Sequence, residues 1–473
     1  MPITYSSFDG SLPHLAYWAQ NAGGGTEIVL FNPETMGRKT LDLPEGVENL
    51  QIAGALSPDG EWLAFHTGSA GKVNYYGYPP DIDLSGPLDL TLHLLHLPDR
   101  KMITVTELLS SDYPANFDEV AEYLMANDPY YSQVEDIEEV KKLIMEIFLY
   151  GINTFDWSPD SRYLAFAGEM DGPTSDLYVY DTRTGGITRL TDGYGQMVGG
   201  MRWSPDGKWI LHSSTNNPNG MQWTREVYAA RAGGGGAKYV TMSMSLGSWV
   251  SSNTAEFSEA ANGPGLYGLR KVNIETGKVS DIWKDSYNAY ALSAVDGSAA
   301  VCANDGFFDE SIEAGLYIVP SYGKPRRLSS AYDCRDLAYR GEHAHTFLMN
   351  GYYSGILGVT REDAVEMIVD EEGWMFVSPD YQWMVFHERQ ETGGISALRL
   401  FDRDDVPLRD IDAYLPEHLF WRGDSLGFFF AVENRMYYVS IPDGNPVLIE
   451  ENLENCYGDD YCFWGAFDYR WIP

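Results

Sequence analysis

The sequence predicts an all-β protein, a single β-propeller of four-stranded antiparallel blades with one α-helical insertion. Two observations predict it. A Ser-Pro-Asp turn between two short apolar strands occurs four times, beginning at Ser57, Ser158, Ser204 and Ser378. The copies are spaced by about one blade of chain, with 46 residues from Ser158 to Ser204. Tight turns that recur at such a period are typical of a radial array of small sheets.

The same spacing predicts units that have lost the motif. Ser204 and Ser378 are 174 residues apart, which is four steps of 43.5. Three degenerate units are therefore expected to begin near residues 247, 290 and 334, where apolar strands separated by turns are found. A further unit begins at Phe420. We count nine units, and eight blades, the usual upper bound, remain the alternative.

The two chain ends are expected to complete one blade. Residues 14–18, 26–31 and 39–43 have the pattern of second, third and fourth strands, and residues 467–470 resemble the first strand of a unit. A last strand that joins the first blade closes a propeller over residues 1–473 and leaves no open sheet edge. The alternative makes residues 5–10 the missing strand and its turn.

Residues 111–152 depart from the strand pattern and predict helices inserted between two blades. Asn116 and Ser132 are each followed three residues later by a glutamate, which is the spacing of a capping box. In a propeller of this strand order, fourth-to-first and second-to-third connections emerge on one face. The insertion therefore shares a face with the longest loops, and the Ser-Pro-Asp turns lie on the other.

The Ser-Pro-Asp-Gly turns and the Asp-x-x-Thr-Gly turn at residues 181–185 resemble the WD-repeat-like propeller repeats of the TolB type. Such repeats also build the propellers of prolyl oligopeptidases and dipeptidyl peptidases. The resemblance covers nearly the whole chain, although only four units contain Ser-Pro-Asp. It implies blades around a central channel and roles that are mostly protein or peptide binding. It implies no catalytic residue, because the repeat motif is structural.

Aromatic residues in the long loops of the insertion face form the predicted partner-binding rim. Such side chains bury much area at a small entropic cost, so they are favoured at protein interfaces. The alternative is that the rings pack beneath the helices and seal the mouth of the channel. The rim residues are Tyr75, Tyr76, Tyr78, Trp223, Phe307 and Phe308.

Charge and hydropathy exclude some partners. The chain has 69 acidic and 32 basic residues, and its formal net charge of −37 repels phosphate backbones, so nucleic acid is not expected as a partner. No apolar stretch is long enough to span a bilayer. The first residues lack the pattern of a secretory signal, which predicts a cytoplasmic protein. A periplasmic or extracellular protein whose leader had been removed would look the same.

The four cysteines fall into two pairs. Cys302 and Cys334 lie in predicted strands and are expected to be plain core residues. Cys456 and Cys462 are spaced so that a disulfide between them would close a small loop in an oxidising compartment.

No catalytic or metal-binding set is predicted. Residues 423–427 match the nucleophile elbow around Ser425, but no histidine follows and the segment occupies the first turn of a blade. His343 and His345 share one strand face without a third ligand. The aspartates of the four Ser-Pro-Asp turns are expected to accept hydrogen bonds from their own backbone. A peptidase is not expected either, because no α/β catalytic domain follows the last blade.

Two functions are consistent with these features. The favoured one is a non-enzymatic scaffold that binds a protein or peptide through the face with the helical insertion. The alternative is a propeller enzyme or small-ligand binder, lyase- or glycosidase-like, that uses carboxylates and histidines around the channel mouth. The missing catalytic set favours the first, so neither enzymatic activity nor a cofactor is expected.

Overall fold

The computed structural model describes most of the chain. The described residues are 3–20, 26–43, 55–68, 89–111, 113–128, 131–152, 154–170, 175–192, 197–215, 225–243, 245–260, 267–284, 287–292, 297–303, 313–330, 334–339, 346–350, 356–359, 365–369, 373–388, 396–402, 407–413, 418–432, 435–453 and 469–473.

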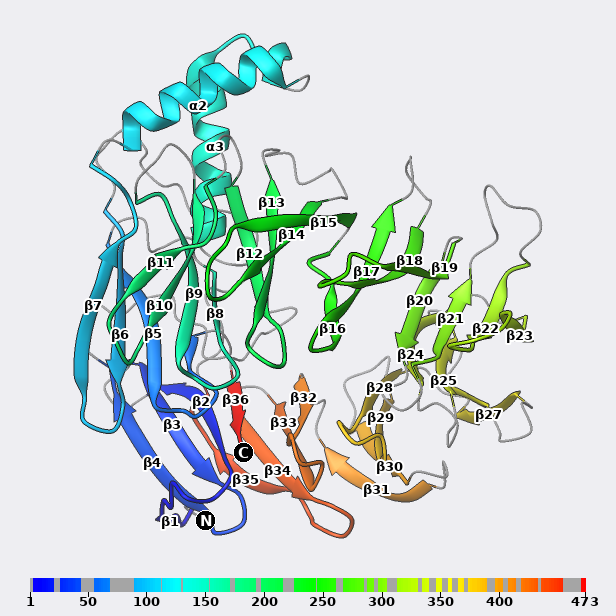
Figure 1. The fold of residues 1–473 in the computed structure, drawn as a ribbon. Helices are drawn as coiled ribbons and strands as arrows, with labels where there is room; N and C mark the ends of the chain where they lie inside the picture. The colour runs from blue at the N-terminus through cyan, green and yellow to red at the C-terminus, as the bar shows by residue number, and fades with distance from the viewer. Residues whose placement is uncertain are drawn as a thin grey trace. The chain divides into compact units, whose positions relative to one another are not determined.

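The fold is an all-β propeller built from small antiparallel sheets, as predicted (Figure 1). Within the described ranges there are nine sheets, of which eight have four or more strands. These eight are complete blades, and they agree with the alternative count of eight. The ninth repeat unit corresponds to a sheet with three strands among the described residues, and a single bridge joins Leu56 to Leu63 beside it.

The chain divides into two compact units. Unit 1 comprises residues 1–42, 261–268 and 281–473. Its sheets are β1 (Ser6–Ser7), β2 (His14–Gln20), β3 (Thr26–Asn32), β4 (Gly37–Asp42) with β36 (Tyr469–Ile472); β20 (Tyr287–Leu292), β21 (Ala299–Ala303), β22 (Gly315–Val319), β23 (Arg326–Ser329); β24 (Cys334–Tyr339), β25 (Thr346–Asn350), β26 (Ile356–Val359), β27 (Val365–Val369); β28 (Gly373–Val377), β29 (Met384–Glu388), β30 (Ser396–Phe401), β31 (Pro407–Ala413); and β32 (His418–Trp421), β33 (Gly427–Val432), β34 (Arg435–Ser440), β35 (Val447–Glu450).

Unit 2 comprises residues 43–260 and 269–280, and β18 and β19 include residues of both units. Its sheets are β5 (Trp62–Thr67), β6 (Thr91–His96), β7 (Lys101–Glu107); β8 (Phe155–Trp157), β9 (Tyr163–Gly168), β10 (Asp176–Asp181), β11 (Ile187–Arg189); β12 (Met197–Trp203), β13 (Trp209–Thr215), β14 (Arg225–Arg231), β15 (Ala237–Ser243); and β16 (Ser248–Ser251), β17 (Thr254–Ala260), β18 (Tyr267–Asn273), β19 (Val279–Trp283).

The predicted insertion contains two α-helices, α2 (Tyr113–Asn127) and α3 (Ile137–Ile152), with the 3-10 turn η2 (Tyr131–Gln133) between them. Their buried apolar residues, which include Phe117 and Ile144, join the core of the neighbouring sheets. The expected capping boxes are not used, because α2 begins before Asn116 and Ser132 lies in η2. The start of α3 is instead capped by Asp136, whose Oδ1 accepts the Glu138 N–H at 2.9 Å.

Both ends of the chain join one five-stranded sheet. β36 pairs antiparallel with β2, with Leu15 opposite Trp471. β1 pairs parallel with β4 at the other edge, so it is not the missing first strand that the alternative placed at residues 5–10. The C-terminal strand therefore occupies the first-strand place of the N-terminal sheet.

Each Ser-Pro-Asp turn is closed by its own side chains. In the first copy, the buried Ser57 hydroxyl donates to Asp59 Oδ1 at 2.6 Å and accepts the Trp62 N–H at 2.9 Å, while Asp59 Oδ1 also accepts the Glu61 N–H at 3.0 Å. The serine hydroxyls of the other three copies make the same bonds. The four aspartates therefore act as backbone acceptors, as expected, and fix the turn between two strands.

A tryptophan just before the turn ties a sheet to the preceding one. The Trp157 indole N–H donates to the Ala55 carbonyl at 3.0 Å, and the Trp203 indole N–H donates to the Asp156 carbonyl at 2.8 Å. The Trp249 and Trp421 indoles donate in the same way to the main-chain carbonyls of Arg202 and Phe376. The two residues of each pair belong to the same unit. Trp157 and Trp203 are buried, so these hydrogen bonds lie between the sheets, away from water.

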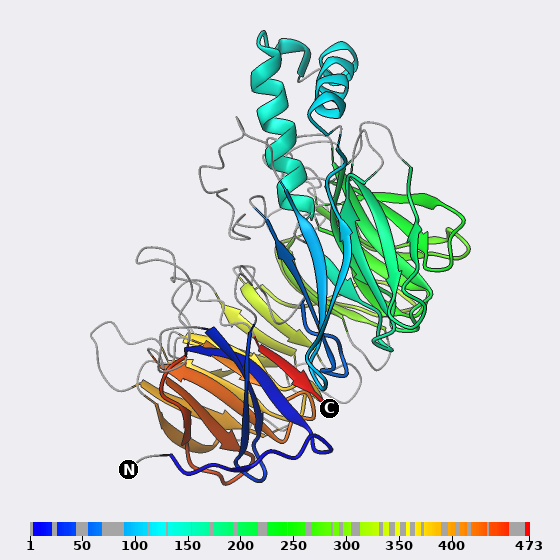
Figure 2. The same cartoon turned by 90° about the vertical axis from the view of Figure 1, so that its left-hand side faces the viewer.

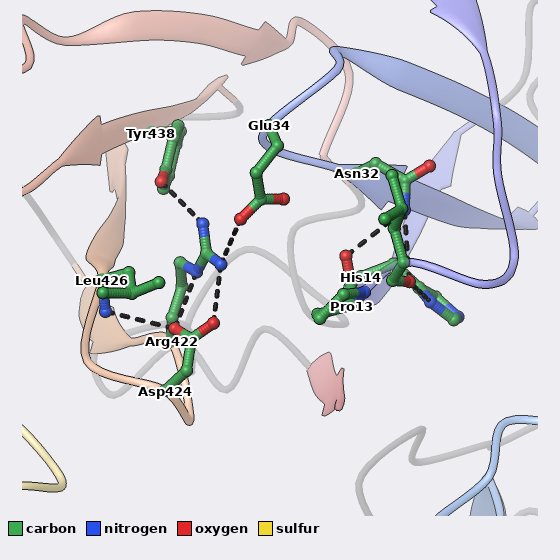
Figure 3. A network of polar contacts seen from close by, with 9 residues as sticks. Pro13, His14, Asn32, Glu34, Arg422, Asp424, Leu426 and Tyr438 are labelled. Carbon is green, nitrogen blue, oxygen red and sulfur yellow. Dashed lines mark hydrogen bonds and ion pairs between the residues drawn. The ribbon is translucent and has the colours of Figure 1, made fainter.

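The sheet β32–β35 has Arg422 at the position of the turn serine. Its guanidinium, 2% exposed, donates to both Asp424 oxygens, at 2.9 and 2.7 Å, and to the Tyr438 hydroxyl at 2.8 Å (Figure 3). It also pairs with Glu34, which lies between β3 and β4, and its carbon centre lies 4.7 Å from the Trp471 ring. The arginine thus joins the last sheet of the chain to the sheet that contains both termini.

Cys302 lies fully buried in β21 and is disulfide-bonded. The expectation of a plain core cysteine is therefore wrong for this residue, because an apolar strand pattern indicates burial but not what lies beside the sulfur. Cys456 and Cys462 lie outside the described residues. No helix in the described ranges is both long and apolar enough to cross a membrane.

We expect Trp157→Phe to lower the free energy of unfolding by about 1–3 kcal/mol, because it leaves the buried Ala55 carbonyl without its donor. Urea titration measures this. The matched control is Trp374→Phe, since Trp374 is 42% exposed and its truncation is expected to cost about 0.5 kcal/mol or less. Equal losses for the two variants would contradict a role for the indole hydrogen bond.

We expect Arg422→Met to destabilise the protein by about 2–3 kcal/mol, because Asp424, Glu34 and Tyr438 lose the buried guanidinium that donates to them. The control is Arg327→Met, which removes a surface pair with Glu313 and is expected to cost about 0–1 kcal/mol. Thermal and urea unfolding of both variants measure the difference. A loss at Arg422 no larger than at Arg327 would show that the network adds no stability.

Candidate functional site

The buried polar groups of unit 2 include residues at β9, β10 and β13, in the two sheets against which α3 packs. Figure 2 shows α2 and α3 beyond the ends of these strands. α3 packs against β12 and β9, and Leu109, which follows β7, forms a parallel bridge with Glu169, which follows β9. A fourth-to-first connection therefore lies beside a second-to-third connection, which is the arrangement that the strand order predicted. This is the face on which the sequence placed the functional loops.

Glu169 anchors the chain segment that leads into the helices. Its carboxylate is fully buried and accepts the Ser110 N–H at 3.0 Å and the Ser110 hydroxyl at 3.1 Å. The Ser110 N–H also donates to the Glu169 carbonyl at 2.8 Å. These bonds compensate for removing a charged group from water, and they hold the start of the insertion against β9.

Asp176 begins β10 with a second buried carboxylate. Its Oδ2 accepts Arg189 Nε at 3.1 Å, and its Oδ1 accepts the Thr191 hydroxyl at 2.7 Å. The neighbouring Ser175 hydroxyl, also buried, accepts the Val198 N–H of the next sheet at 3.0 Å. The arginine neutralises the carboxylate charge, so this part of the site is fixed and close to neutral.

His212 and Ser214 lie on one face of β13 and are 3% and 4% exposed. Neither ring nitrogen of His212, nor the Ser214 hydroxyl, has a hydrogen-bond partner within the part of the chain that the structure describes. Burial lowers the pKa of His212 to about 4, against a smaller opposing effect of the Ser213 backbone, so the imidazole is neutral near pH 7. A neutral imidazole offers one donor and one acceptor.

The neighbouring strand extends this polar surface. Tyr228 of β14 stands opposite His212, with the two rings stacked at 5.5 Å between centroids. The Tyr228 hydroxyl donates to Glu226 at 2.8 Å, and Glu226 stands opposite Ser214. The arrangement places an imidazole, a hydroxyl and a carboxylate on one face of the sheet, which suits recognition of a neutral polar group such as an amide or a hydroxyl.

The six predicted rim residues, Tyr75, Tyr76, Tyr78, Trp223, Phe307 and Phe308, lie outside the described residues. The same holds for His343 and His345. Sequence reasoning missed His212, Ser214 and Asp176. The signal was a histidine and two serines inside the apolar strand at residues 209–215, but burial there depends on the neighbouring sheet.

The rejected nucleophile Ser425 is 2% exposed, and its hydroxyl accepts the Asp380 N–H at 3.1 Å. Its φ of 62° is the left-handed value of a turn residue, so it serves the link between two sheets. No group of three or more His, Cys, Asp or Glu among the described residues could hold a metal ion. His66 and His387 belong to different units and pack on Phe155 and Trp374, respectively.

No family model matches the chain. One relative, described as the uncharacterized peptidase YuxL of Bacillus subtilis (strain 168), is 46% identical over 56 residues, which are 12% of this chain and 8% of the relative. A crystal structure described as a eukaryotic initiation factor matches 98% of each chain with a TM-score of 0.54 and 12% identity, which concerns the fold alone. A prolyl endopeptidase structure matches 74% of this chain and 57% of its own, with a TM-score of 0.40 and 13% identity.

These comparisons correct the favoured functional interpretation. One relative that shares sequence with this chain is described as a peptidase, so the expectations of a non-enzymatic scaffold and of no enzymatic activity are wrong. Both expectations were based on the lack of a recognisable catalytic set and catalytic domain. A structural repeat motif gives no information about either. The chain matches only a small part of the length of this relative.

Two buried histidines predict how stability depends on pH. Burial lowers the pKa of His212 and of His387 from 6.5 to about 4, so the unfolded chain binds more protons than the folded one between these values. Each histidine is therefore expected to remove about 3 kcal/mol of stability as the pH falls from 6.5 to 4. The loss begins below 6.5 and is complete near 4.

Urea titrations of the wild type, His212→Leu and His387→Leu at several pH values measure this effect. Each variant is expected to lose less stability than the wild type on acidification, because it lacks one group that must take up a proton on unfolding. Parallel pH profiles for all three proteins would contradict neutral, buried imidazoles.

Proposed function

We propose that this chain is an enzyme, or the propeller of one, that acts on peptides. The observation that carries the proposal is the 46% identity over 56 residues to a peptidase. The repeats are assigned to the TolB type by their Ser-Pro-Asp-Gly turns, in keeping with the resemblance to the propellers of prolyl oligopeptidases.

The polar face formed by His212, Ser214 and Glu226 is the proposed contact for a substrate amide. A neutral imidazole and a hydroxyl can both donate to a peptide carbonyl and accept from a peptide N–H. Buried donors and acceptors with no partner within the described ranges favour a bound polar group, because each costs about 1–3 kcal/mol if left unpaired. The six aromatic rim residues are proposed as further contacts for peptide side chains.

A second candidate is a small-ligand enzyme, lyase- or glycosidase-like, on the same face. It is favoured by the presence of buried carboxylates, Glu169 and Asp176, and of a buried imidazole, His212, in the same unit, since acid and base groups are what such reactions use. Sugar hydroxyls satisfy the same donors and acceptors as a peptide group.

The test compares substrates and variants of the full chain. We expect cleavage of a fluorogenic peptide library and a loss of about tenfold or more in kcat/KM for His212→Gln, since one good hydrogen bond is worth about 1–2 kcal/mol. An oligosaccharide panel assayed in parallel distinguishes the second candidate.

The matched control is His387→Gln, which changes a histidine of similar burial in unit 1 and is expected to leave kcat/KM unchanged. Circular dichroism checks that both variants fold. Cleavage of neither peptides nor sugars, alone or with added lysate of the source cells, would overturn the proposal of an enzyme.

A further inference from the structure

We propose that Cys302 is bonded to Cys334, and that this disulfide is a structural cross-link between two neighbouring sheets of unit 1. The proposal is independent of the proposed function, since it concerns the sheets β20–β23 and β24–β27, and the candidate site lies in unit 2. It names a modification that the apolar pattern of the strands did not predict.

The first observation is the state of Cys302. It is disulfide-bonded, 0% exposed, and lies in β21 between the buried Val301 and Ala303. It stands opposite Ala289 of β20. The chain has four cysteines, so the second sulfur belongs to Cys334, Cys456 or Cys462 if the bond is within one molecule.

The second observation is the placement of the strands. β24 begins at Cys334 and packs against both β20 and β21. A disulfide requires the two Cα atoms to lie within about 7 Å, so a cysteine of a strand that packs against β21 is a candidate partner for Cys302. Cys456 and Cys462 follow β35, after the last sheet of unit 1, in a segment outside the described residues. The strand placement therefore favours Cys334.

The burial of Cys302 decides when the bond can form. Oxidation removes two protons and two electrons from the two thiols, and an external disulfide of the glutathione class accepts them and becomes two thiols. A thiol that is fully buried in the folded protein, as at Cys302, cannot be reached by such a reagent. The bond must therefore form before or while β21 takes its place, and it must then resist reduction in the folded protein.

A structural disulfide of this kind is typical of proteins that fold in an oxidising compartment. The inference therefore favours the periplasmic or extracellular alternative over the cytoplasmic expectation. A reversible redox sensor would instead need a solvent-accessible cysteine of lowered pKa, which a fully buried residue of a central strand does not offer.

The first experiment is a peptide map of the full chain produced in an oxidising compartment. Free thiols are alkylated in denaturant without reductant, and the digest is analysed by mass spectrometry. A cross-linked peptide pair containing Cys302 and Cys334 is expected. A pair joining Cys302 to Cys456 or Cys462, or four alkylated cysteines, would overturn the proposal.

A thiol count gives a second test that needs no digest. In denaturant, Cys302→Ala and Cys334→Ala are each expected to show one more reactive thiol than the wild type, because each frees its partner. If Cys334 were unbonded, Cys334→Ala would show one thiol fewer. The count is made on denatured chains, so it holds even for a variant that fails to fold.

The structural role is tested by reductant. The cross-link is expected to survive a phosphine reductant in native buffer and to be lost when denaturant is added. Reduction of the bond in the native protein at the rate seen in denaturant would show an exposed disulfide and contradict the assignment.

Discussion

Neighbouring sheets in each unit are joined by a repeated hydrogen bond from a tryptophan indole to a main-chain carbonyl of the preceding sheet. Trp157, Trp203 and Trp249 donate in this way along unit 2, and Trp421 does so in unit 1. The bond needs the indole at one place relative to the turn that follows. The Ser-Pro-Asp turn provides this, because its serine and aspartate fix the backbone immediately after the tryptophan. Trp249 and Trp421 make the same link in sheets without Ser-Pro-Asp, so other turns can also place the indole.

Arg422 shows how far the turn can change while its geometry is kept. The backbone bonds are those of the other turns, with the Arg422 N–H donating to the Gly427 carbonyl as the Ser57 N–H donates to the Trp62 carbonyl. Asp424 keeps its role as acceptor but receives a guanidinium in place of a hydroxyl. The longer side chain also reaches Glu34, so a turn that elsewhere organises one sheet here connects two.

The buried polar groups of the candidate site are of two kinds. Glu169 and Asp176 have buried carboxylates with their partners in place, whereas His212 and Ser214 are buried without a hydrogen-bond partner within the described ranges. Buried donors and acceptors without a partner within the described ranges, as at His212 and Ser214, suit recognition of an uncharged polar group. The helices extend beyond the ends of these sheets (Figure 2), and α3 packs against β12 and β9.

The features that depend on residues close together in the chain could be predicted from the amino-acid sequence. The Ser57–Asp59 turn closes within six residues, so its pattern predicted the hairpins, their spacing predicted the sheets, and a break in that spacing predicted α2 and α3. Which polar groups are buried, and which residues they contact, depends on how distant segments pack. Arg422 finds Glu34 across 388 residues, and the burial of His212 depends on a neighbouring sheet; Cys302 is bonded to a residue that its own strand does not contain. Such contacts follow from the packing of distant segments, and no local pattern encodes them.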